Sequence, residues 1–171
     1  AFDGLYVYQP LLKACCHLIG QPFKLSSMHA RTLHPHAQSQ GLHIDFKPDE
    51  ERFPLVSFIW MVDEFHGNNG ATQFLPGSHH WSEVPHELTN AHLAEDENQT
   101  VKACGQAGSI IIFNGSVLHG HSANVTDTPR RSIQGAFIPR DAQAGTDFST
   151  SMGSDTRTRI GSLARYLLAV Q

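Results

Sequence analysis

The sequence carries little charge and no excess of positive charge. Its 171 residues include 12 Lys and Arg against 16 Asp and Glu, for a formal net charge of −4. The basic residues are scattered along the chain rather than clustered in one segment. Because a nucleic-acid-binding surface usually needs a basic patch, we expect no nucleic-acid partner.

Long apolar runs are also missing. No stretch approaches the roughly 18 apolar residues that a membrane-spanning helix needs, and no basic-then-apolar signal peptide stands at the visible N-terminus. These absences predict a soluble protein without a membrane partner. The chain opens with Ala1 rather than Met and soon enters an amphipathic stretch. We therefore expect a single domain over residues 1–171 that lacks an upstream N-terminal segment.

Cysteine is scarce, and its three positions form no framework. Cys15 and Cys16 are adjacent and Cys104 stands alone, which fits neither a set of disulfides nor a Cys-x-x-Cys zinc site. A reducing, cytoplasmic location fits this pattern best. The sequence also lacks His-Glu-x-x-His, which argues against a zinc protease.

Short runs typical of β-strands dominate the sequence after about residue 22. They are rich in β-branched and aromatic residues and are separated by Gly, Pro and Asn turns; they cover 23–33, 41–46, 54–62, 71–77, 108–113 and 130–138. Amphipathic helices are predicted over 4–19 and 156–170, the second with an apolar face of Ile160, Leu163, Leu167 and Val170. The polar segment 82–100 is expected to be a long loop. This order predicts a mainly β jelly roll with flanking α-helices.

Histidine is unusually frequent, with twelve residues, as many as all Lys and Arg together. His43 and Asp45 lie two positions apart in a predicted strand, and the period of two in a strand places both side chains on one face. Such a pair needs a distant third ligand to hold a metal ion. The extended segment after 108–113 offers two candidates, His119 and His121.

Two neutral imidazoles and one carboxylate form the facial triad of non-haem iron(II), which leaves coordination positions open. In the last predicted strand, Arg130 and Ser132 share one face because of the same period of two. A guanidinium beside a hydroxyl is suited to hold a carboxylate through charge-assisted hydrogen bonds. The sequence therefore combines a candidate metal site with a candidate carboxylate site.

Taken together, these motifs resemble the phytanoyl-CoA dioxygenase family, which includes ectoine hydroxylase. The resemblance covers about residues 40–140. It is carried by Leu-His-Ile-Asp at 42–45, Trp60, the run from Asn68 to His79 that ends in Pro-Gly-Ser-His, the run 108–120, Asn124 and Arg130. The resemblance implies a double-stranded β-helix and dependence on iron(II), 2-oxoglutarate and O₂.

The resemblance also implies site roles: His43 and Asp45 would bind iron, and Arg130 would bind the distal carboxylate of 2-oxoglutarate. The spacing of the family's metal histidine and arginine selects His119, rather than His121, as the third ligand. We expect Trp60, Ser132 and His121 near the cosubstrate. His121 is a departure, because relatives commonly have Gly-Ser at the position of Gly120-His121.

The predicted activity is hydroxylation of a small organic substrate, with succinate and CO₂ as coproducts. The carboxylate of Asp45 favours hydroxylation over halogenation, because relatives that halogenate have a small residue in its place. A non-oxidative cupin-type metal enzyme, an isomerase or a lyase, is the alternative; it would need the triad but not Arg130. A third interpretation, a binding module that keeps only the fold, is opposed by the intact triad.

Overall fold

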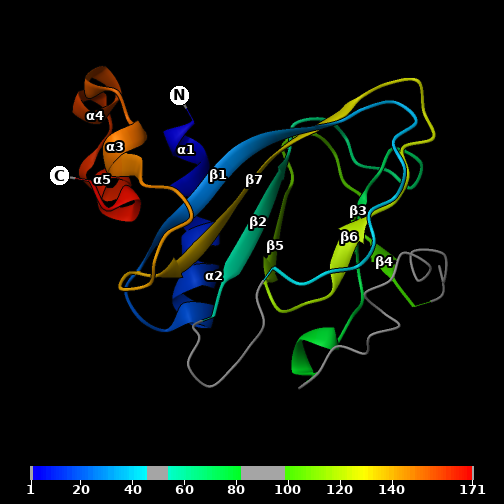
Figure 1. Cartoon of the computed structure of the whole chain (residues 1–171), viewed down its shortest axis with the longest axis horizontal. Helices are drawn as coiled ribbons and strands as arrows, with labels where there is room; N and C mark the ends of the chain where they lie inside the picture. Colours follow the sequence, from blue (N-terminus) through cyan, green and yellow to red (C-terminus); the bar gives the residue numbers. More distant parts are fainter. Residues whose placement is uncertain (1, 46–53, 82–98, 171) are drawn as a thin grey trace.

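A four-stranded β-sheet lies at the centre of the molecule (Figure 1). The structure is a computed structural model that describes residues 2–45, 54–81 and 99–170. The strands of this larger sheet are antiparallel and follow the order β1-β7-β2-β5. Their bounds are Phe23–Leu33 for β1, Val56–Met61 for β2, Ile110–Asn114 for β5 and Arg130–Pro139 for β7.

A smaller sheet stands to one side of the larger one (Figure 1). Its three antiparallel strands follow the order β4-β3-β6, with bounds Thr72–Phe74 for β3, Val101–Lys102 for β4 and His119–His121 for β6. The chain leaves β2 for β3, returns to β5, crosses to β6 and returns to β7. This crossing between two sheets confirms the predicted double-stranded β-helix.

Helices cover the face of the larger sheet that lies away from the smaller one (Figure 1). Phe58 and Phe137 from the sheet join Leu11, Cys15 and Leu167 from the helices in one buried apolar core. None of the helices within the described ranges has the length and apolar character needed to cross a membrane. The helix bounds are Asp3–Tyr6 for α1, Gln9–Ile19 for α2, Phe148–Ser151 for α3, Ser154–Arg159 for α4 and Ser162–Leu168 for α5, and a 3-10 turn, η1, spans Ser78–His80.

The predicted N-terminal helix over 4–19 is two helices in the structure. Tyr8 is extended, with ψ of 119°, and α2 begins at Gln9 with Pro10 in its first turn. Proline has no N–H and its ring clashes with the carbonyl four residues earlier, so it is tolerated only at a helix start. The helix then ends as predicted at Gly20, which has a positive φ of 67°.

The predicted C-terminal helix over 156–170 is also divided. Ile160 is extended, with ψ of 145°, and separates α4 from α5. Its side chain is 3% exposed and joins the apolar core, whereas Leu163, which was predicted to be on the apolar face, is 43% exposed. Gly161 follows the break, and glycine is a weak helix former. The amphipathic pattern was correct at Ile160, Leu167 and Val170 but not at Leu163.

A β-bulge in β1 decides which side chains face the space between the sheets. The pairing of β1 with β7 shifts between Leu25 and Ser27. Leu25 lies in the core beneath the helices, and Met28 packs against that same core after the shift. Because one inserted residue reverses the alternation of faces, Ser27, His29 and Arg31 point to the opposite side, between the two sheets.

The predicted strand over 41–46 is wrong for its described part, 41–45. His43 forms a single isolated bridge with His119, and no ladder extends from it. Its neighbour Asp45 donates its backbone N–H to the carbonyl of Gly115, at 2.9 Å, in the turn before β6. Most of the expected loop 82–100 lies outside the described residues.

Candidate metal centre

The backbones of His43 and His119 hold each other by two reciprocal hydrogen bonds. Each N–H donates to the carbonyl of the other residue, and both N···O distances are 2.9 Å. The backbone N–H of Asp45 donates one further hydrogen bond, to the carbonyl of Gly115. Two segments far apart in sequence are thereby joined where their side chains enter the space between the sheets.

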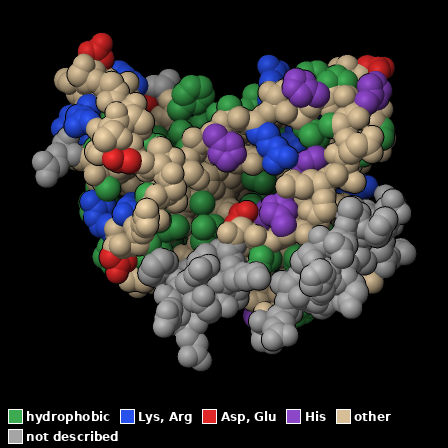
Figure 2. Space-filling view, in the orientation of Figure 1, with side chains coloured by type: hydrophobic (Ala, Val, Ile, Leu, Met, Phe, Trp, Pro, Cys, Tyr) green, Lys and Arg blue, Asp and Glu red, His purple; other side chains and the backbone are tan. Residues whose placement is uncertain are grey.

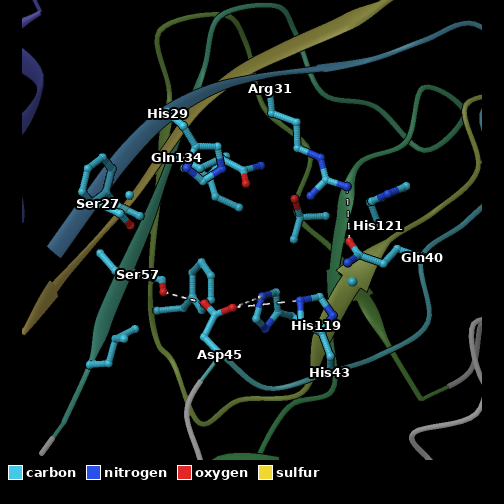
Figure 3. Close-up of a pocket in the computed structure, with 18 of the residues that line it drawn as sticks. Ser27, His29, Arg31, Gln40, His43, Asp45, Ser57, His119, His121 and Gln134 are labelled. Atoms are coloured by element: carbon cyan, nitrogen blue, oxygen red, sulfur yellow. Dashed lines mark hydrogen bonds and ion pairs between the residues drawn. The ribbon is translucent and has the colours of Figure 1, made fainter. Parts of the chain in front are cut away.

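The side chains of His43, Asp45 and His119 converge on one point (Figure 3). Nε2 of His119 lies 3.7 Å from Oδ1 of Asp45, and Nε2 of His43 lies 4.0 Å from the same oxygen. One nitrogen or oxygen from each residue lies within 4.8 Å of the others. These three atoms are close enough to bind one metal ion, and among the described residues this is the one such cluster of three.

The outer nitrogens of both imidazoles have backbone partners. Nδ1 of His43 lies 3.2 Å from the carbonyl of Gly41, and Nδ1 of His119 lies 2.9 Å from that of Val117. A protonated Nδ1 that donates to a carbonyl leaves the Nε2 lone pair for a metal, as is usual in metalloproteins. Burial lowers the pKa of His119 below its usual value, which favours the neutral, metal-binding form.

The carboxylate of Asp45 is oriented by Ser57. The Ser57 hydroxyl donates a hydrogen bond of 2.7 Å to Oδ2, which leaves Oδ1 directed at the two imidazoles. A hydrogen bond to the second oxygen of a ligating carboxylate is a common support of metal sites. The donor set of two imidazole nitrogens and one carboxylate oxygen fits iron(II) with open positions.

His121 lies beside this cluster but does not belong to it. Its side chain is buried, at 7% exposure, and its Nδ1 lies 3.0 Å from the carbonyl of Ser122. The alternation of β6 brings it to the same cavity as His119 (Figure 3). The structure therefore places His121 on the cavity wall, away from the convergence of the three ligand atoms.

Arg130 is almost fully buried, at 1% exposure. One terminal nitrogen donates 2.7 Å to the carbonyl of Gly70, the other reaches the hydroxyl of Ser132 at 3.4 Å, and the guanidinium lies 4.1 Å from the centre of the Phe65 ring. Its Nε has no hydrogen-bond partner among the described residues. A buried guanidinium with an unused donor is costly to leave unmatched, so this side chain suits an incoming carboxylate.

Two predicted site residues do not line the cavity: Ser132 is buried behind it against Arg130, and Trp60 lies elsewhere. On β2, Trp60 shares its face with Val56 and Phe58 beneath the helices. Its indole N–H donates 3.3 Å to the carbonyl of Leu5, and its ring packs edge-on against Tyr8. The alternation of β2 places Ser57, rather than Trp60, on the side of the metal cluster.

The cluster lies in a cavity of about 380 Å³ between the two sheets. Histidine side chains gather around the hollow, with basic and acidic side chains inside it (Figure 2). Sequence reasoning missed several polar lining residues, namely Ser26, Ser27, His29, Arg31, Gln40, Ser57, Thr72 and Gln134. Strand alternation indicates Ser57 and Gln134, whereas the residues of β1 are indicated only once the bulge is known.

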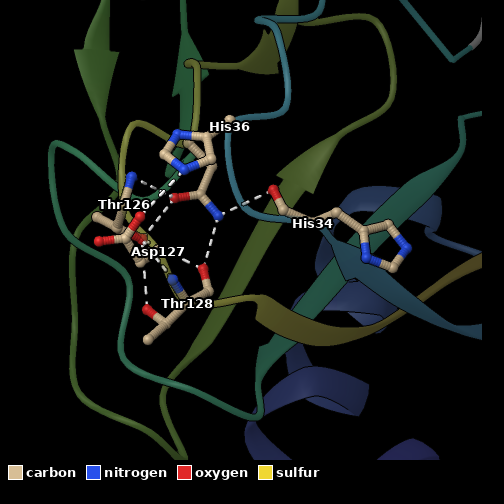
Figure 4. Close-up of polar contacts among 6 residues, drawn as sticks. His34, His36, Thr126, Asp127 and Thr128 are labelled. Carbon is tan, nitrogen blue, oxygen red and sulfur yellow. Dashed lines mark hydrogen bonds and ion pairs between the residues drawn. The ribbon is translucent and has the colours of Figure 1, made fainter.

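A buried asparagine fixes the segment that leads from β1 to His43. Nδ2 of Asn124 donates 3.0 Å to the carbonyl of His34 and 2.9 Å to that of Thr128. Beside it, Nε2 of His36 and Oδ1 of Asp127 lie 3.1 Å apart at the surface (Figure 4). These contacts tie the segment before His43 to the loop between β6 and β7.

Solved structures with low sequence identity share this fold. HygX from Streptomyces hygroscopicus, solved with nickel and 2-oxoglutarate bound, aligns with a TM-score of 0.66 and 16% identity over 84% of this chain and 69% of HygX. Apo EctD from S. alaskensis aligns with a TM-score of 0.60 and 22% identity over 73% of this chain and 48% of EctD. These similarities concern the fold.

Curated relatives are fungal dioxygenases. Dioxygenase trt7 of Aspergillus terreus is 37% identical over 115 residues, which cover 63% of this chain and 38% of trt7. The multifunctional dioxygenase prhA of Penicillium brasilianum is 31% identical over 131 residues, which cover 69% of this chain and 42% of prhA. The chain thus spans less than half the length of these relatives.

The signature of one protein family matches most of the chain. That family is described as phytanoyl-CoA dioxygenase (PhyH), and the match covers residues 8–132. The matched range contains the three side chains that converge in the cavity and the buried Arg130. By this match the chain belongs to the phytanoyl-CoA dioxygenase family.

Proposed function

We propose that this chain is the metal-binding part of an iron(II) and 2-oxoglutarate dependent dioxygenase that hydroxylates a small organic substrate. His43, Asp45 and His119 hold the iron, and Arg130 holds the distal carboxylate of 2-oxoglutarate. The observation that carries the proposal is the presence, in one cavity, of a three-ligand cluster and a buried guanidinium with an unused donor. Family membership supports it independently.

Bound iron would supply the activation of O₂, coupled to conversion of 2-oxoglutarate to succinate and CO₂. The chain's own residues hold and orient the reactants. Ser57 keeps one oxygen of Asp45 away from the metal, and the backbone carbonyls beside both histidines fix the ring orientation. Asp45 supplies a carboxylate ligand, and we accordingly propose hydroxylation rather than halogenation.

The alternative, a non-oxidative cupin-type isomerase or lyase, is less well supported. Such an enzyme would use the three ligands but would leave Arg130 buried without a ligand for its free Nε. The dicarboxylate cosubstrate gives that group a partner. Binding of 2-oxoglutarate therefore separates the two functions.

The direct test is anaerobic addition of Fe(II) and 2-oxoglutarate to the protein. We expect a weak visible charge-transfer band from the iron chelate and, after O₂ is admitted, formation of succinate. Neither step requires knowledge of the substrate. Iron-loaded protein that binds no 2-oxoglutarate at millimolar concentration would refute the proposal.

An Arg130→Leu variant tests the carboxylate site. We expect its affinity for 2-oxoglutarate to fall on the order of 100-fold, because a buried carboxylate would lose a paired guanidinium. Metal affinity, measured by titration calorimetry without 2-oxoglutarate, should stay close to that of the unaltered protein. Equal loss of both affinities would instead indicate misfolding, which circular dichroism would detect.

A further inference from the structure

The cavity contains a second arginine, on β1. After the bulge, Ser27, His29 and Arg31 occupy alternate positions, and all three line the cavity. In Figure 3 the side chain of Arg31 extends from β1 toward Gln40 and His121. The two guanidiniums of the cavity thus come from adjacent strands of the larger sheet, Arg31 from β1 and Arg130 from β7.

Arg31 has no carboxylate partner in the described part of the chain. Its hydrogen bond to Oε1 of Gln40 is long, at 3.5 Å. By contrast, the exposed Arg131 contacts Asp63 at 2.8 Å, and Arg159 contacts Asp3 at 3.6 Å. Arg31 is half-buried beside the cavity. A guanidinium has five N–H donors, and most of those of Arg31 have no partner among the described residues.

The charges of the cavity do not balance without an anionic ligand. Asp45 is the one carboxylate among the described lining residues, and it faces the imidazoles and Ser57. Burial and then the charge of Arg31 lower the pKa of Arg130 to about 10, which is still well above neutral pH. Like charges that share a partly buried space favour a ligand of opposite charge.

The contacts of the two arginines place them at different parts of the cavity wall. Arg130 is fixed by Gly70 and Ser132. Arg31 contacts the side chain of Gln40. The backbone N–H of Gln40 donates a hydrogen bond of 2.9 Å to the carbonyl of His121. Gln40 and His121 belong to the segments that carry His43 and His119, so Arg31 reaches toward the metal-binding side.

We propose that Arg31 is a second carboxylate-binding residue for the cosubstrate, holding the carboxylate beside the keto group while Arg130 holds the distal one. Arg31 and Arg130, which contact no carboxylate among the described residues, then each bind one of the two carboxylates of the cosubstrate. The inference rests on the proposed function. It assigns the residue whose side chain aligns the chelating end of 2-oxoglutarate.

Binding to the Co(II)-loaded protein tests this assignment without turnover. The probes are 2-oxoglutarate and 2-oxopentanoate, which has the same chain length but no distal carboxylate, and the readout is the visible absorption of Co(II). Arg31→Gln should weaken both probes by a similar factor, about tenfold or more. Arg130→Gln should weaken 2-oxoglutarate alone.

Two further variants complete the experiment. Lys13→Gln removes one positive charge from the exposed face of α2 and should change neither affinity. Arg31→Lys keeps the charge but loses the paired donors; we expect affinities for both probes between those of the unaltered protein and Arg31→Gln. Arg31→Lys also provides the comparison if Arg31→Gln fails to fold, and equal affinity of Arg31→Lys and the unaltered protein would then count against the assignment.

Two results would overturn the assignment. If Arg31→Gln leaves both affinities within about twofold, Arg31 does not bind the cosubstrate. If it weakens 2-oxoglutarate alone, Arg31 faces the distal carboxylate instead. Failure of the unaltered protein to bind 2-oxoglutarate is a separate outcome, since it refutes the proposed function itself.

Discussion

Two histidines of β6, separated by one glycine, have different surroundings. Nε2 of His119 points at Asp45 from 3.7 Å, while His121 lies on the cavity wall outside the ligand cluster. Strand alternation puts both on the same side and does not choose between them; from the sequence, the spacing to Arg130 that the family resemblance implies favours His119. The choice depends on the reciprocal bridge, which joins His43 to His119 rather than to His121.

Metal binding by two matched variants tests this difference. We expect His119→Ala to lose stoichiometric binding of Fe(II) or Co(II), because it removes one of three ligand atoms. His121→Ala should retain the metal with affinity within about tenfold, since its effect passes through neighbouring groups. Metal content after dialysis and calorimetric titration provide the measurement. Retention by His119→Ala together with loss in His121→Ala would show that the ligand assignment is wrong.

The short strand β6 lies directly beneath the segment that leads to His43. A Cβ placed on Gly120 would lie 2.6 Å from the carbonyl oxygen of Gln40 and 3.0 Å from that of Gly41. Both contacts are with backbone atoms, so the side chain of a larger residue could not be accommodated without a shift of one segment. Such a shift would separate His119 from His43.

Gly120→Ala should therefore affect stability and metal binding together. We expect a loss of about 1–3 kcal/mol in the free energy of unfolding and weaker metal binding. Gly67→Ala is the matched control, because a Cβ there meets no atom within 4 Å. Chemical denaturation and metal titration of both variants provide the measurements. Equal metal affinity in the two variants would contradict the argument.

Strand alternation could be read from the sequence, but its interruptions could not. The bounds of β1 agree with the predicted run 23–33, because its β-type residues end in turns on both sides. The bulge after Leu25 leaves no clear mark in the sequence, so Ser27, His29 and Arg31 were not predicted to line the cavity. Trp60 was placed by family resemblance, and the alternation of β2 puts it beneath the helices instead.

At the scale of the whole molecule, the jelly roll and the convergence of distant motifs could be expected from sequence. The packing of α2 and α5 on one sheet face could not, because amphipathicity shows which side of a helix is buried but not its partner. The ends of two adjacent strands of the larger sheet are also linked by a pair that the sequence did not indicate. Asp63 accepts hydrogen bonds from the backbone N–H of Arg131 at 2.7 Å and from its guanidinium at 2.9 and 2.8 Å.

This pair makes the stability of the fold depend on pH. The hydrogen bonds from Arg131 hold the pKa of Asp63 below its usual value. A depressed pKa in the folded state means that the carboxylate stabilises the fold above the unfolded pKa of about 3.9. That contribution is lost as the pH falls through the lower, folded value.

Asp63→Asn is the variant that tests this dependence. In metal-free protein we expect a slightly lower melting temperature than that of the unaltered chain at pH 7, because the pair is exposed and screened. The difference should shrink as the pH is lowered below the usual range of aspartate. Thermal denaturation, followed by circular dichroism at pH 7 and at the lower pH, measures the difference in melting temperature between the two proteins. A difference that stays constant or grows on acidification would contradict the assigned pair.

The reciprocal hydrogen bonds between His43 and His119 have a consequence for how the metal enters. Bringing His43 and His119 together closes a long loop of the chain, which has an entropic cost. Folding of the β-sheets closes this loop before a metal binds. The candidate ligand nitrogens of the two histidines are therefore positioned by the fold itself. In small zinc domains, by contrast, the chain folds only when the metal binds. The backbone amides of these two residues should therefore exchange slowly with deuterium before any metal is added, and metal uptake becomes a ligand-exchange step at an already folded site.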